Sequence, residues 1–492
     1  MRQAGHYASP MLHPRPFYYL ENFCTALAWL RQRYGDLLNA TESGFMEGFL
    51  ALPRESAALL ARMIGRKGEL FRTAKLRYAE IGCPVAAAAP LSAHGWVDCQ
   101  PVLTFAEVGR MLRKAELCAA FRVDGVARGA RGARKGELIE SLTVTCTEAR
   151  PLTDWWPEAP DAVYRLAIKP LCERLRLLFF GNFRQDWSEF VLTDLGIFKY
   201  EKVVCDTETR AFQTRAHIDA FETLFLCRQR LAEEGSDLEA ILASLPNPIT
   251  DNEWLENRRS KLQLHLLERL RVKSGVKLPR SRRPPPDWVT FQLVLPTPER
   301  PARLEQATAE ALSQPDAPVY YVENGLLNSL FGLWCWEAIF APVAGAFFHE
   351  FQAAPADLHT PGFQARRAEL FAKCFQQLDS DAYRDVITSN FAAKQDIQSP
   401  FVFWGVISQS LLTLALDCLP REHLRACFER ILADIRAHRS GLPDLVQFWP
   451  AERRYRLIEV KGPGDRLQDN QVRWLRFCVA HAIPVSVCHV SW

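Results

Sequence analysis

The chain has 492 residues, of which 48% are hydrophobic and 24% are charged, and its formal net charge is +3. These values fit a folded protein of three or four domains, and a nearly neutral charge gives no evidence by itself for a nucleic-acid partner. The fourteen cysteines include no CxxC pair. This argues against a zinc finger and against a secreted disulfide framework, so we expect a reducing cytoplasm.

Three further classes of protein find no support in the sequence. No charged segment followed by an apolar one opens the chain, so no signal peptide is expected. A GxxxxGK(S/T) motif is absent, so nothing suggests an ATPase. The most membrane-like stretch, 326–348, contains Asn328, Glu337 and Pro342, which favours a buried core helix over a membrane span.

The N-terminal part combines a helical pattern with a basic segment. Residues 1–16 are expected to be disordered, whereas residues 17–59 carry apolar side chains at helical spacing. The next segment, LLARMIGRKGELFRTAKLRY, has a single acid, Glu69. It fits either a solvated helix face or a patch that binds DNA phosphates through counterion release. The candidate DNA contacts are Arg66, Lys67, Arg72 and Lys75.

A second basic group lies in a glycine-rich stretch. Residues 105–142 predict helix, loop and helix, and the loop is crowded by Arg128, Arg131, Arg134 and Lys135. The second helix begins near Gly136, and both helix N-termini and basic loops favour phosphate. We therefore expect DNA contacts here as well.

The middle of the chain is predicted to be helical. Residues 161–180 are expected to form one helix with Asp161 as its cap, and residues 217–272 are strongly helical. Residues 271–283 carry six positive charges and no acid before a run of three prolines. That segment fits an exposed linker, with contact to the DNA backbone as the alternative.

The segment 441–461, GLPDLVQFWPAERRYRLIEVK, predicts a short β-hairpin. Because the side chains of a strand alternate between its faces, Glu459 and Lys461 point to the same side. Asp444 stands at the start of the first strand, so the hairpin would bring it beside Glu459. Two carboxylates and an ammonium group would then meet at one point.

Such a group suits the hydrolysis of a phosphodiester. Asp444, Glu459 and the carbonyl of Val460 offer the oxygen ligands that Mg²⁺ or Mn²⁺ prefers, and a bound cation activates water and neutralises phosphate charge. Lys461 could orient the water or stabilise the developing charge. The pattern is that of the PD-(D/E)xK nucleases, although the bare pattern is more often a solvated hairpin edge.

The residues around the hairpin extend this interpretation. Residues 466–482 predict a helix and residues 484–490 a buried strand, which gives the order strand, strand, helix, strand. Arg436 and Arg439 precede the hairpin and Arg466 follows it. Surface arginines are usually only solvated, but a guanidinium next to such a site is a natural phosphate clamp.

Nucleases of this fold often take a further carboxylate from an upstream helix. We predict a long apolar helix from Val319 that carries two candidates, Glu323 and Glu337, fourteen residues apart. This distance is close to four helical turns, so both side chains could share one face. The spacing does not choose between them.

Several motifs resemble the Fanconi-associated nuclease family with its VRR-NUC domain: GLPDL, EVKGPGDRL and NQVRWL near the end, and YYLENF, GRKGELFRTAKLRYAEI and ENGLLNSLFGLWCWEAIF before them. The resemblance implies a multidomain, mainly α protein with a C-terminal α/β PD-(D/E)xK core. The implied parts are an N-terminal DNA-binding domain (1–97), a SAP-like domain (98–150), a TPR-like helical domain (151–315) and a nuclease module (316–492, core about 375–492).

The resemblance also implies roles for single residues. Glu323 becomes the distant catalytic carboxylate and metal ligand, and Gln471 has a supporting catalytic role. Glu337 is then structural or paired with a base such as Arg366 or Arg367. In the family, basic residues near Arg436 and Arg439 hold the 5′ end of the DNA, but Asn470 stands where some relatives have a basic residue.

The activity implied by the family is 5′-flap endonuclease and 5′-to-3′ exonuclease action in interstrand crosslink repair, with one or two Mg²⁺ or Mn²⁺ ions. The expected partners are branched or flapped DNA and proteins bound by the helical array, with no membrane and no ATP, in the bacterial cytoplasm near the nucleoid. The ubiquitin-binding zinc finger of eukaryotic relatives is not expected. Two alternatives stay open: a Holliday-junction or restriction-type endonuclease with the same core, and an inactive DNA-binding scaffold.

Overall fold

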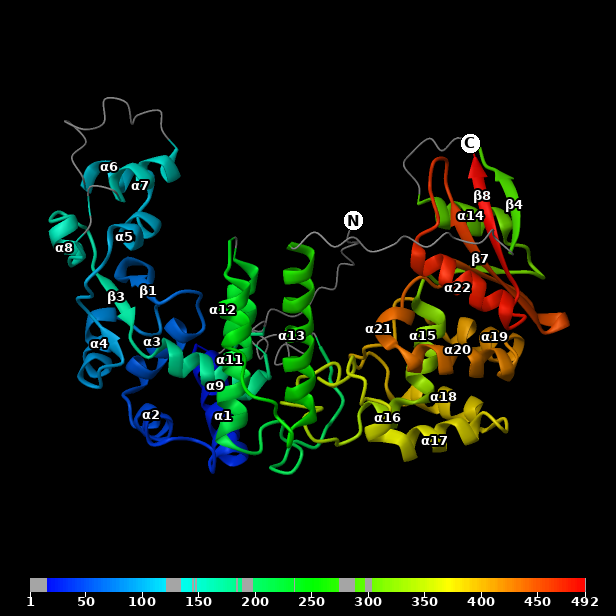
Figure 1. Cartoon of the computed structure of the whole chain (residues 1–492), viewed down its shortest axis with the longest axis horizontal. Helices are drawn as coiled ribbons and strands as arrows, with labels where there is room; N and C mark the ends of the chain where they lie inside the picture. Colours follow the sequence, from blue (N-terminus) through cyan, green and yellow to red (C-terminus); the bar gives the residue numbers. More distant parts are fainter. Residues whose placement is uncertain are drawn as a thin grey trace. The chain divides into compact units, whose positions relative to one another are not determined.

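The computed structural model describes residues 16–120, 134–143, 146, 148–182, 185–187, 198–233, 235–273, 288–296 and 303–491. The chain forms two compact units, Met1–Val191 and Leu192–Trp492 (Figure 1). No described helix has the length and apolar character needed to cross a membrane. Two of the predicted DNA contacts, Arg128 and Arg131, lie outside the described residues, and so do residues 274–283 of the expected linker.

The first unit begins with the helices predicted for residues 17–59. These are α1 (Tyr18–Tyr34), α2 (Ala40–Leu50) and α3 (Arg54–Ile64), followed by α4 (Pro84–Ala93). A capping box starts α2: the Asn39 side chain accepts from the Glu42 N–H, and the Glu42 carboxylate accepts from the Asn39 N–H, both at 2.9 Å. Two N–H groups at the helix start are thereby satisfied.

A small sheet of three strands completes this unit. Its strands are β1 (Leu70–Arg72), β2 (Val97–Asp98) and β3 (Val163–Leu166), in the order β1-β3-β2 and antiparallel. The prediction of one helix over 161–180 is therefore wrong in its first part, and α9 covers only Lys169–Phe180. Pro170 in the first turn favours a helix start there. Asp161 does not cap the helix, because its carboxylate binds Arg72 and the Ala74 N–H.

The predicted helix, loop and helix over 105–142 are observed at both ends. The helices are α5 (Phe105–Met111), α6 (Lys114–Ala120) and α7 (Lys135–Thr143), with α8 (Leu152–Trp155) after them. Phe105, Leu117 and Leu138 are buried in one cluster with Trp155. The predicted loop between α6 and α7 falls largely outside the described residues.

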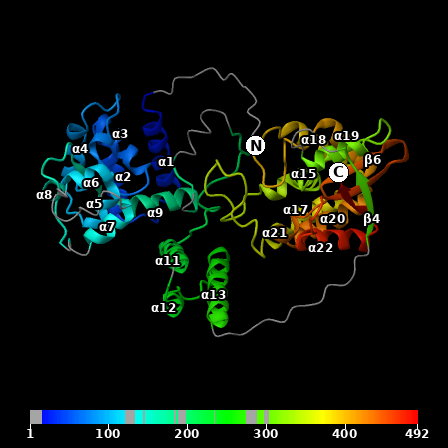
Figure 2. The same cartoon turned by 90° about the horizontal axis from the view of Figure 1, so that it is seen from above.

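The second unit starts with the predicted helical segment. Its helices are α11 (Arg215–Ala232), α12 (Leu238–Ala243) and α13 (Glu253–Lys273). They lie side by side (Figures 1 and 2) and share a cluster of buried leucines that includes Leu224, Leu231 and Leu266. The helical prediction for residues 217–272 is thus confirmed.

The nuclease core predicted from the hairpin is a mixed sheet of five strands. The strands are β4 (Val289–Val294), β5 (Val319–Tyr321), β6 (Leu445–Trp449), β7 (Arg454–Lys461) and β8 (Val485–Ser491), in the order β4-β8-β7-β6-β5. β7 pairs antiparallel with β6 and parallel with β8, as expected from the order strand, strand, helix, strand. Two strands from before residue 375 extend the predicted core at both edges.

The long helix predicted from Val319 is wrong at its start. Residues Val319–Tyr321 form β5, which pairs with β6, and helix α15 (Gly325–Trp334) begins only after Asn324. Asn324 has a left-handed backbone with φ of 48°, which breaks any continuous helix. A short helix, α16 (Trp336–Ile339), then carries Glu337. Every residue of α15 is buried, as expected of a core helix.

Helices cover both faces of the sheet. On one face α14 (Leu304–Leu312) packs over Leu445, Ile458 and Val460. The other face contacts a larger helical cluster that includes α15 and is completed by α17 (Ala368–Gln377), α18 (Ala382–Ala393), α19 (Gln409–Cys418), α20 (Arg421–Ala433), α21 (Ile435–His438) and α22 (Asp469–Ala480). This packing fixes the hairpin between two apolar layers.

A glycine holds the segment before Asp444 against α22. Gly441 has φ of +87°, and a Cβ there would lie 2.7 Å from the Asn470 carbonyl carbon. We expect Gly441→Ala to lower the free energy of unfolding by about 2–4 kcal/mol, from backbone strain and overpacking. Urea unfolding followed by tryptophan fluorescence measures this loss.

The matched control is Gly464→Ala. Gly464 has a similar φ of +83° but nothing within 4 Å of its Cβ position. This substitution should cost only about 1–2 kcal/mol from the left-handed backbone. Equal losses in the two variants would contradict the close contact at Asn470.

Candidate active site

The β6–β7 hairpin places Asp444 beside Glu459. Leu445 pairs with Ile458, so the next position along the register sets Asp444 opposite Glu459. Asp444 Oδ2 accepts a hydrogen bond of 2.9 Å from the Val460 N–H. The two carboxylates predicted to meet do lie together at one end of the sheet.

Lys461 completes this group on the face that strand alternation predicted. Its Nζ lies 2.7 Å from Glu459 Oε1, and the Glu459 side chain is 0% exposed. Apart from this ion pair, neither carboxylate oxygen of Glu459 has a hydrogen-bond partner among the described residues. A buried carboxylate with free oxygens is costly unless a cation or a proton balances it. The oxygen donors present therefore fit a divalent cation.

Burial and mutual repulsion make both carboxylates weaker acids. Burial raises the pKa of Glu459 well above its usual range, the charge of Asp444 raises it further, and Lys461 opposes both effects. Burial likewise raises the pKa of Asp444, against the Val460 hydrogen bond and the charge of Lys461. Two carboxyl groups that compete for protons in this way are also able to exchange those protons for a metal ion.

Glu323 is tied to Asp444 through the backbone. The Val322 and Glu323 N–H groups both donate to the Asp444 carbonyl oxygen, at 2.8 and 3.0 Å. The Glu323 side chain itself is exposed, and its Oε2 accepts a hydrogen bond from the Tyr321 hydroxyl. Within the described parts of the chain, no three Asp, Glu, His or Cys side chains are grouped as ligands of one ion.

The turn that carries Glu323 is held on its other side by asparagines. Asn324 Oδ1 accepts from the Leu442 N–H at 3.1 Å. Asn328 Nδ2 donates to the Asn324 carbonyl at 2.6 Å and to the Arg439 carbonyl at 2.9 Å. These bonds join the start of α15 to the segment that leads into Asp444, and no sequence motif had pointed to them.

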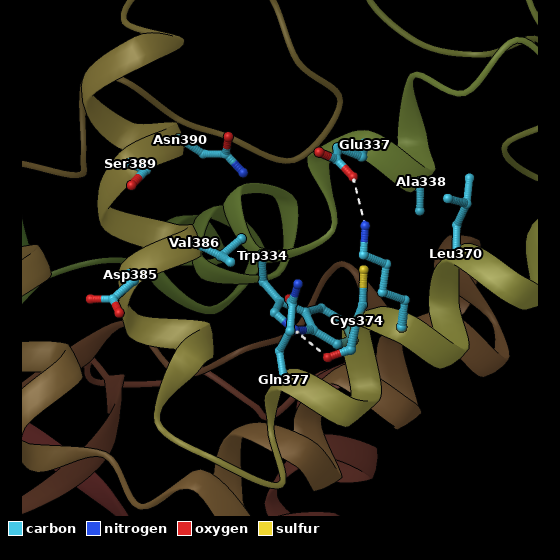
Figure 3. Close-up of a pocket in the computed structure, with 11 residues that line it drawn as sticks. Trp334, Glu337, Ala338, Leu370, Cys374, Gln377, Asp385, Val386, Ser389 and Asn390 are labelled. Carbon is cyan, nitrogen blue, oxygen red and sulfur yellow. Dashed lines mark hydrogen bonds and ion pairs between the residues drawn. The ribbon is translucent and has the colours of Figure 1, made fainter.

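The second candidate for the distant carboxylate, Glu337, lies in a different place. It lines a cavity of about 310 Å³ between α16, α17 and α18, together with Trp334 and Cys374 (Figure 3). Among the described residues, Glu337 forms an ion pair with Lys373, with 4.0 Å between Nζ and Oε2. The predicted pairing with Arg366 or Arg367 is wrong, because both guanidinium groups bind the buried carboxylate of Asp357.

Gln471 stands in the first turn of α22, as predicted. Its Oε1 accepts from the Gln468 N–H at 2.9 Å, in a capping arrangement. The structure therefore gives this side chain a contact at the helix start, and its supporting catalytic role stays a prediction.

Sequence reasoning missed one acid near the site, Glu305. It lies half-buried in the first turn of α14, a helix that contacts both β5 and β7. Its negative charge is one of the causes that raise the pKa of Asp444. The residue lies far upstream of the hairpin, and no spacing rule connects the two.

The predicted N-terminal basic contacts only partly form one surface. Arg66, Lys67 and Lys75 line a cavity of about 500 Å³, together with Arg110, which the sequence analysis had not singled out. Lys135 is adjacent, since its Nζ donates to the Arg110 carbonyl at 3.1 Å.

Arg72 is a correction to that group. It also borders the cavity, but its side chain is only 8% exposed, and its guanidinium forms ion pairs of 2.6 Å with both Asp161 and Glu116. These contacts join β1 to α6 and to the segment just before β3, so the charge of Arg72 is engaged within the protein. No motif or spacing connects Arg72 with these two distant acids.

The arginines before the hairpin differ from one another. Arg436 is exposed and lines a cavity of about 340 Å³ with Lys261 and His359. Burial and the charges of Arg439, Arg436 and Lys261 lower the pKa of His359.

The other predicted arginines near these sites have different surroundings. Arg439 donates to the Pro400 carbonyl at 3.0 Å, so part of its guanidinium is already hydrogen-bonded within the protein. Arg466 is exposed just after β7, and Arg134 just before α7.

Known proteins similar to this chain agree with its architecture. Family models match three parts: the VRR-NUC domain (residues 378–492), the FAN1 HTH domain (17–98) and the Fanconi anemia-associated nuclease SAP domain (102–155). A Fanconi-associated nuclease 1 homolog of Pseudomonas aeruginosa is 47% identical over 550 aligned positions, which cover 98% of this chain and 97% of that protein. A homolog of Oryza sativa subsp. japonica is 23% identical, over 98% of this chain and 63% of its own length.

A solved structure gives the same result in three dimensions. The crystal structure of paFAN1 bound to 2nt 5′flap DNA with gap superposes with a TM-score of 0.86 and 46% identity. The match covers 98% of this chain and 99% of that one. A second structure of paFAN1, with 1nt 5′flap DNA, has a TM-score of 0.85.

The electrostatic cost of the two carboxylates can be measured without any metal. Because their folded-state pKa values are raised, the native protein binds more protons than the unfolded chain between about pH 4 and neutrality. Stability therefore falls as the pH rises through that window. In metal-free protein, Asp444→Asn should raise the free energy of unfolding by on the order of 1–3 kcal/mol at pH 8 and by much less at pH 4.5.

Thermal and urea unfolding at the two pH values check this expectation. Glu452→Gln is the control, since Glu452 is exposed on the hairpin turn and pairs only with Arg454 among the described residues. A loss of stability in Asp444→Asn at pH 8 would mean that the carboxylate is not under electrostatic strain.

Proposed function

The chain belongs to the Fanconi-associated nuclease family and is a DNA nuclease, and we propose that it cuts 5′ flaps and degrades DNA from the 5′ end in the repair of interstrand crosslinks. One observation carries the proposed chemistry. The fully buried Glu459, next to Asp444 and Lys461, has oxygens that no protein group satisfies apart from Lys461 in the described chain. Such a site is built to hold a cation.

The proposed ligands of Mg²⁺ or Mn²⁺ are Asp444, Glu459, the carbonyl of Val460 and the exposed carboxylate of Glu323. When bound, the metal would make a water molecule more acidic and neutralise charge on the phosphate. Lys461, held 2.7 Å from Glu459, would orient the attacking water or stabilise the negative charge on the phosphate oxygens in the transition state. The new bond would join the water oxygen to phosphorus, and the bond between phosphorus and the 3′ oxygen would break. The upstream product would then end in a 3′-hydroxyl and the downstream product would begin with a 5′-phosphate.

The basic cavities of the two units would hold the DNA. In the first unit the proposed contacts are Arg66, Lys67, Lys75 and Arg110, with Arg134 and Lys135 of the SAP-like domain beside them. In the second unit the cavity around Arg436, Lys261 and His359 is proposed to bind the 5′-phosphate end, with Arg439 and Arg466 near it. The paFAN1 structures with 5′flap DNA support flapped DNA as the substrate.

A Holliday-junction resolvase with the same core is the alternative to flap cleavage. An inactive scaffold is a weaker alternative, because the residues at the four core positions are all chemically competent: Asp444, Glu459, Lys461 and Glu323. Only the pattern of substrates separates these functions, since the core chemistry is common to the first two.

One test of the proposed function concerns substrate choice and the distant carboxylate. Labelled 5′-flap, 3′-flap, four-way-junction and duplex DNA are incubated with Mg²⁺ or Mn²⁺, with EDTA as a control. We expect metal-dependent cutting of the 5′ flap, at least a hundredfold slower in Asp444→Ala and Glu323→Ala because metal ligands are lost.

Glu337→Ala serves as the matched carboxylate control. Glu337 lies in the separate cavity of Figure 3, so its loss should leave the cutting rate within about twofold of wild type. A preference for the four-way junction would favour a resolvase. No cutting by folded, metal-loaded protein would favour the scaffold.

A further test of the proposed function concerns the 5′ end of the DNA. If Arg436 binds a terminal phosphate, Arg436→Ala should reduce the preference for 5′-phosphorylated over 5′-hydroxyl flaps by roughly tenfold, as a charged hydrogen bond is lost. Arg421→Ala is the control, because the exposed Arg421 pairs with Glu422 and does not line that cavity. Competition between the two kinds of flap measures the ratio, and an unchanged ratio would exclude Arg436 as the phosphate ligand.

A further inference from the structure

One hydrogen bond controls the direction of the Glu323 carboxylate. The Tyr321 hydroxyl donates to Glu323 Oε2, and among the described residues this is the hydrogen bond that the carboxylate makes. Glu323 is otherwise exposed, so without this bond its side chain would be free to sample several rotamers.

The hydroxyl is itself held at a fixed place relative to Asp444. Tyr321 is the last residue of β5 and pairs with Leu445, the neighbour of Asp444. Its ring packs in the apolar layer with Leu304 and Ile458. The next two N–H groups, of Val322 and Glu323, both donate to the Asp444 carbonyl. Backbone and ring are thus both anchored next to the first carboxylate of the site.

From this geometry we infer that Tyr321 is a positioning residue of the metal site, whose hydroxyl sets the carboxylate of Glu323 beside Asp444 before the cation binds. The inference rests on the proposed role of Glu323 as a metal ligand. A ligand that is already oriented loses less rotamer freedom when the cation arrives, so the site binds the cation more tightly. Partners that orient metal ligands are typically worth about 10–100-fold in metal affinity or activity.

A tyrosine hydroxyl carries its proton at neutral pH and is therefore a donor. A protonated phenol can donate to a carboxylate and leaves the second carboxylate oxygen free for a metal ion.

The neighbouring tyrosine provides a matched control within the same strand. Tyr320 precedes Tyr321 in β5, so its side chain points to the opposite face of the sheet. There its ring packs edge to face with Phe448, with 6.1 Å between the ring centroids. Tyr320→Phe therefore removes a hydroxyl from β5 without touching Glu323.

The test compares wild type, Tyr321→Phe, Tyr320→Phe, Glu323→Ala and the double variant Tyr321→Phe with Glu323→Ala. The Mn²⁺ concentration for half-maximal cutting of a 5′ flap is measured, together with Mn²⁺ binding by calorimetry without DNA and the thermal midpoint. We expect Tyr321→Phe to need about tenfold more Mn²⁺ in both measurements, with an unchanged thermal midpoint. Tyr320→Phe should match wild type.

The double variant shows whether Tyr321 acts through Glu323. If it does, Tyr321→Phe adds nothing to the defect of Glu323→Ala. Wild-type Mn²⁺ dependence in Tyr321→Phe, beside a defective Glu323→Ala, would overturn the inference and leave the proposed function intact. Full activity in Glu323→Ala with loss in Asp444→Ala would instead remove Glu323 from the metal site and the inference with it.

Discussion

The site depends on hydrogen bonds that meet at Asp444. Its carbonyl oxygen accepts the N–H groups of Val322 and Glu323, and its Oδ2 accepts the N–H of Val460. One residue thus joins the end of β5, the start of β6 and the end of β7. β5 lies more than a hundred residues before the β6–β7 hairpin, yet the backbone of a single aspartate brings the acidic groups of both segments to one end of the sheet.

This arrangement is costly in the absence of a metal. Glu459 is fully buried, and both it and Asp444 have raised pKa values, chiefly from burial. The apolar layers on both sides of the sheet, with Leu445 and Ile458 on one face and Val446 and Leu457 on the other, supply the packing that holds the carboxylates in place. Stability in the rest of the module offsets electrostatic strain at the site, a common relation in enzymes.

The hairpin and its polar face could be predicted because the information is local. The alternation of side chains over a few residues is enough to place Glu459 and Lys461 on one face of β7. The hairpin pairing then places Asp444 directly across from Glu459. The same reasoning failed where distant pairing decides the structure. Val319–Tyr321 became a strand because β6 was available as its partner. Val163–Leu166 became a strand because it pairs with both β1 and β2.

The same distinction between local sequence information and distant contacts applies to the roles of single side chains. The resemblance, not the spacing, selected Glu323 over Glu337, and the break at Asn324 explains why helical spacing had no bearing on the choice. Glu305 was missed because α14 is brought to the site only by packing on β5 and β7. Tyr321, by contrast, stands two residues before Glu323, but no pattern of types or spacing marks a hydroxyl as the partner of an acid.

The net charge of +3 does not reveal the basic surfaces, because several charged side chains form ion pairs with one another inside the protein. Arg72 is neutralised by Asp161 and Glu116, and Arg366 and Arg367 share Asp357. Among the accessible basic side chains, two groups lie close together: Arg66, Lys67, Lys75 and Arg110 around one cavity, and Lys261, His359 and Arg436 around another. Affinity for a polyanion depends on such local clusters, since each neutralised phosphate releases counterions. Composition therefore says little about DNA binding until the internal ion pairs have been identified.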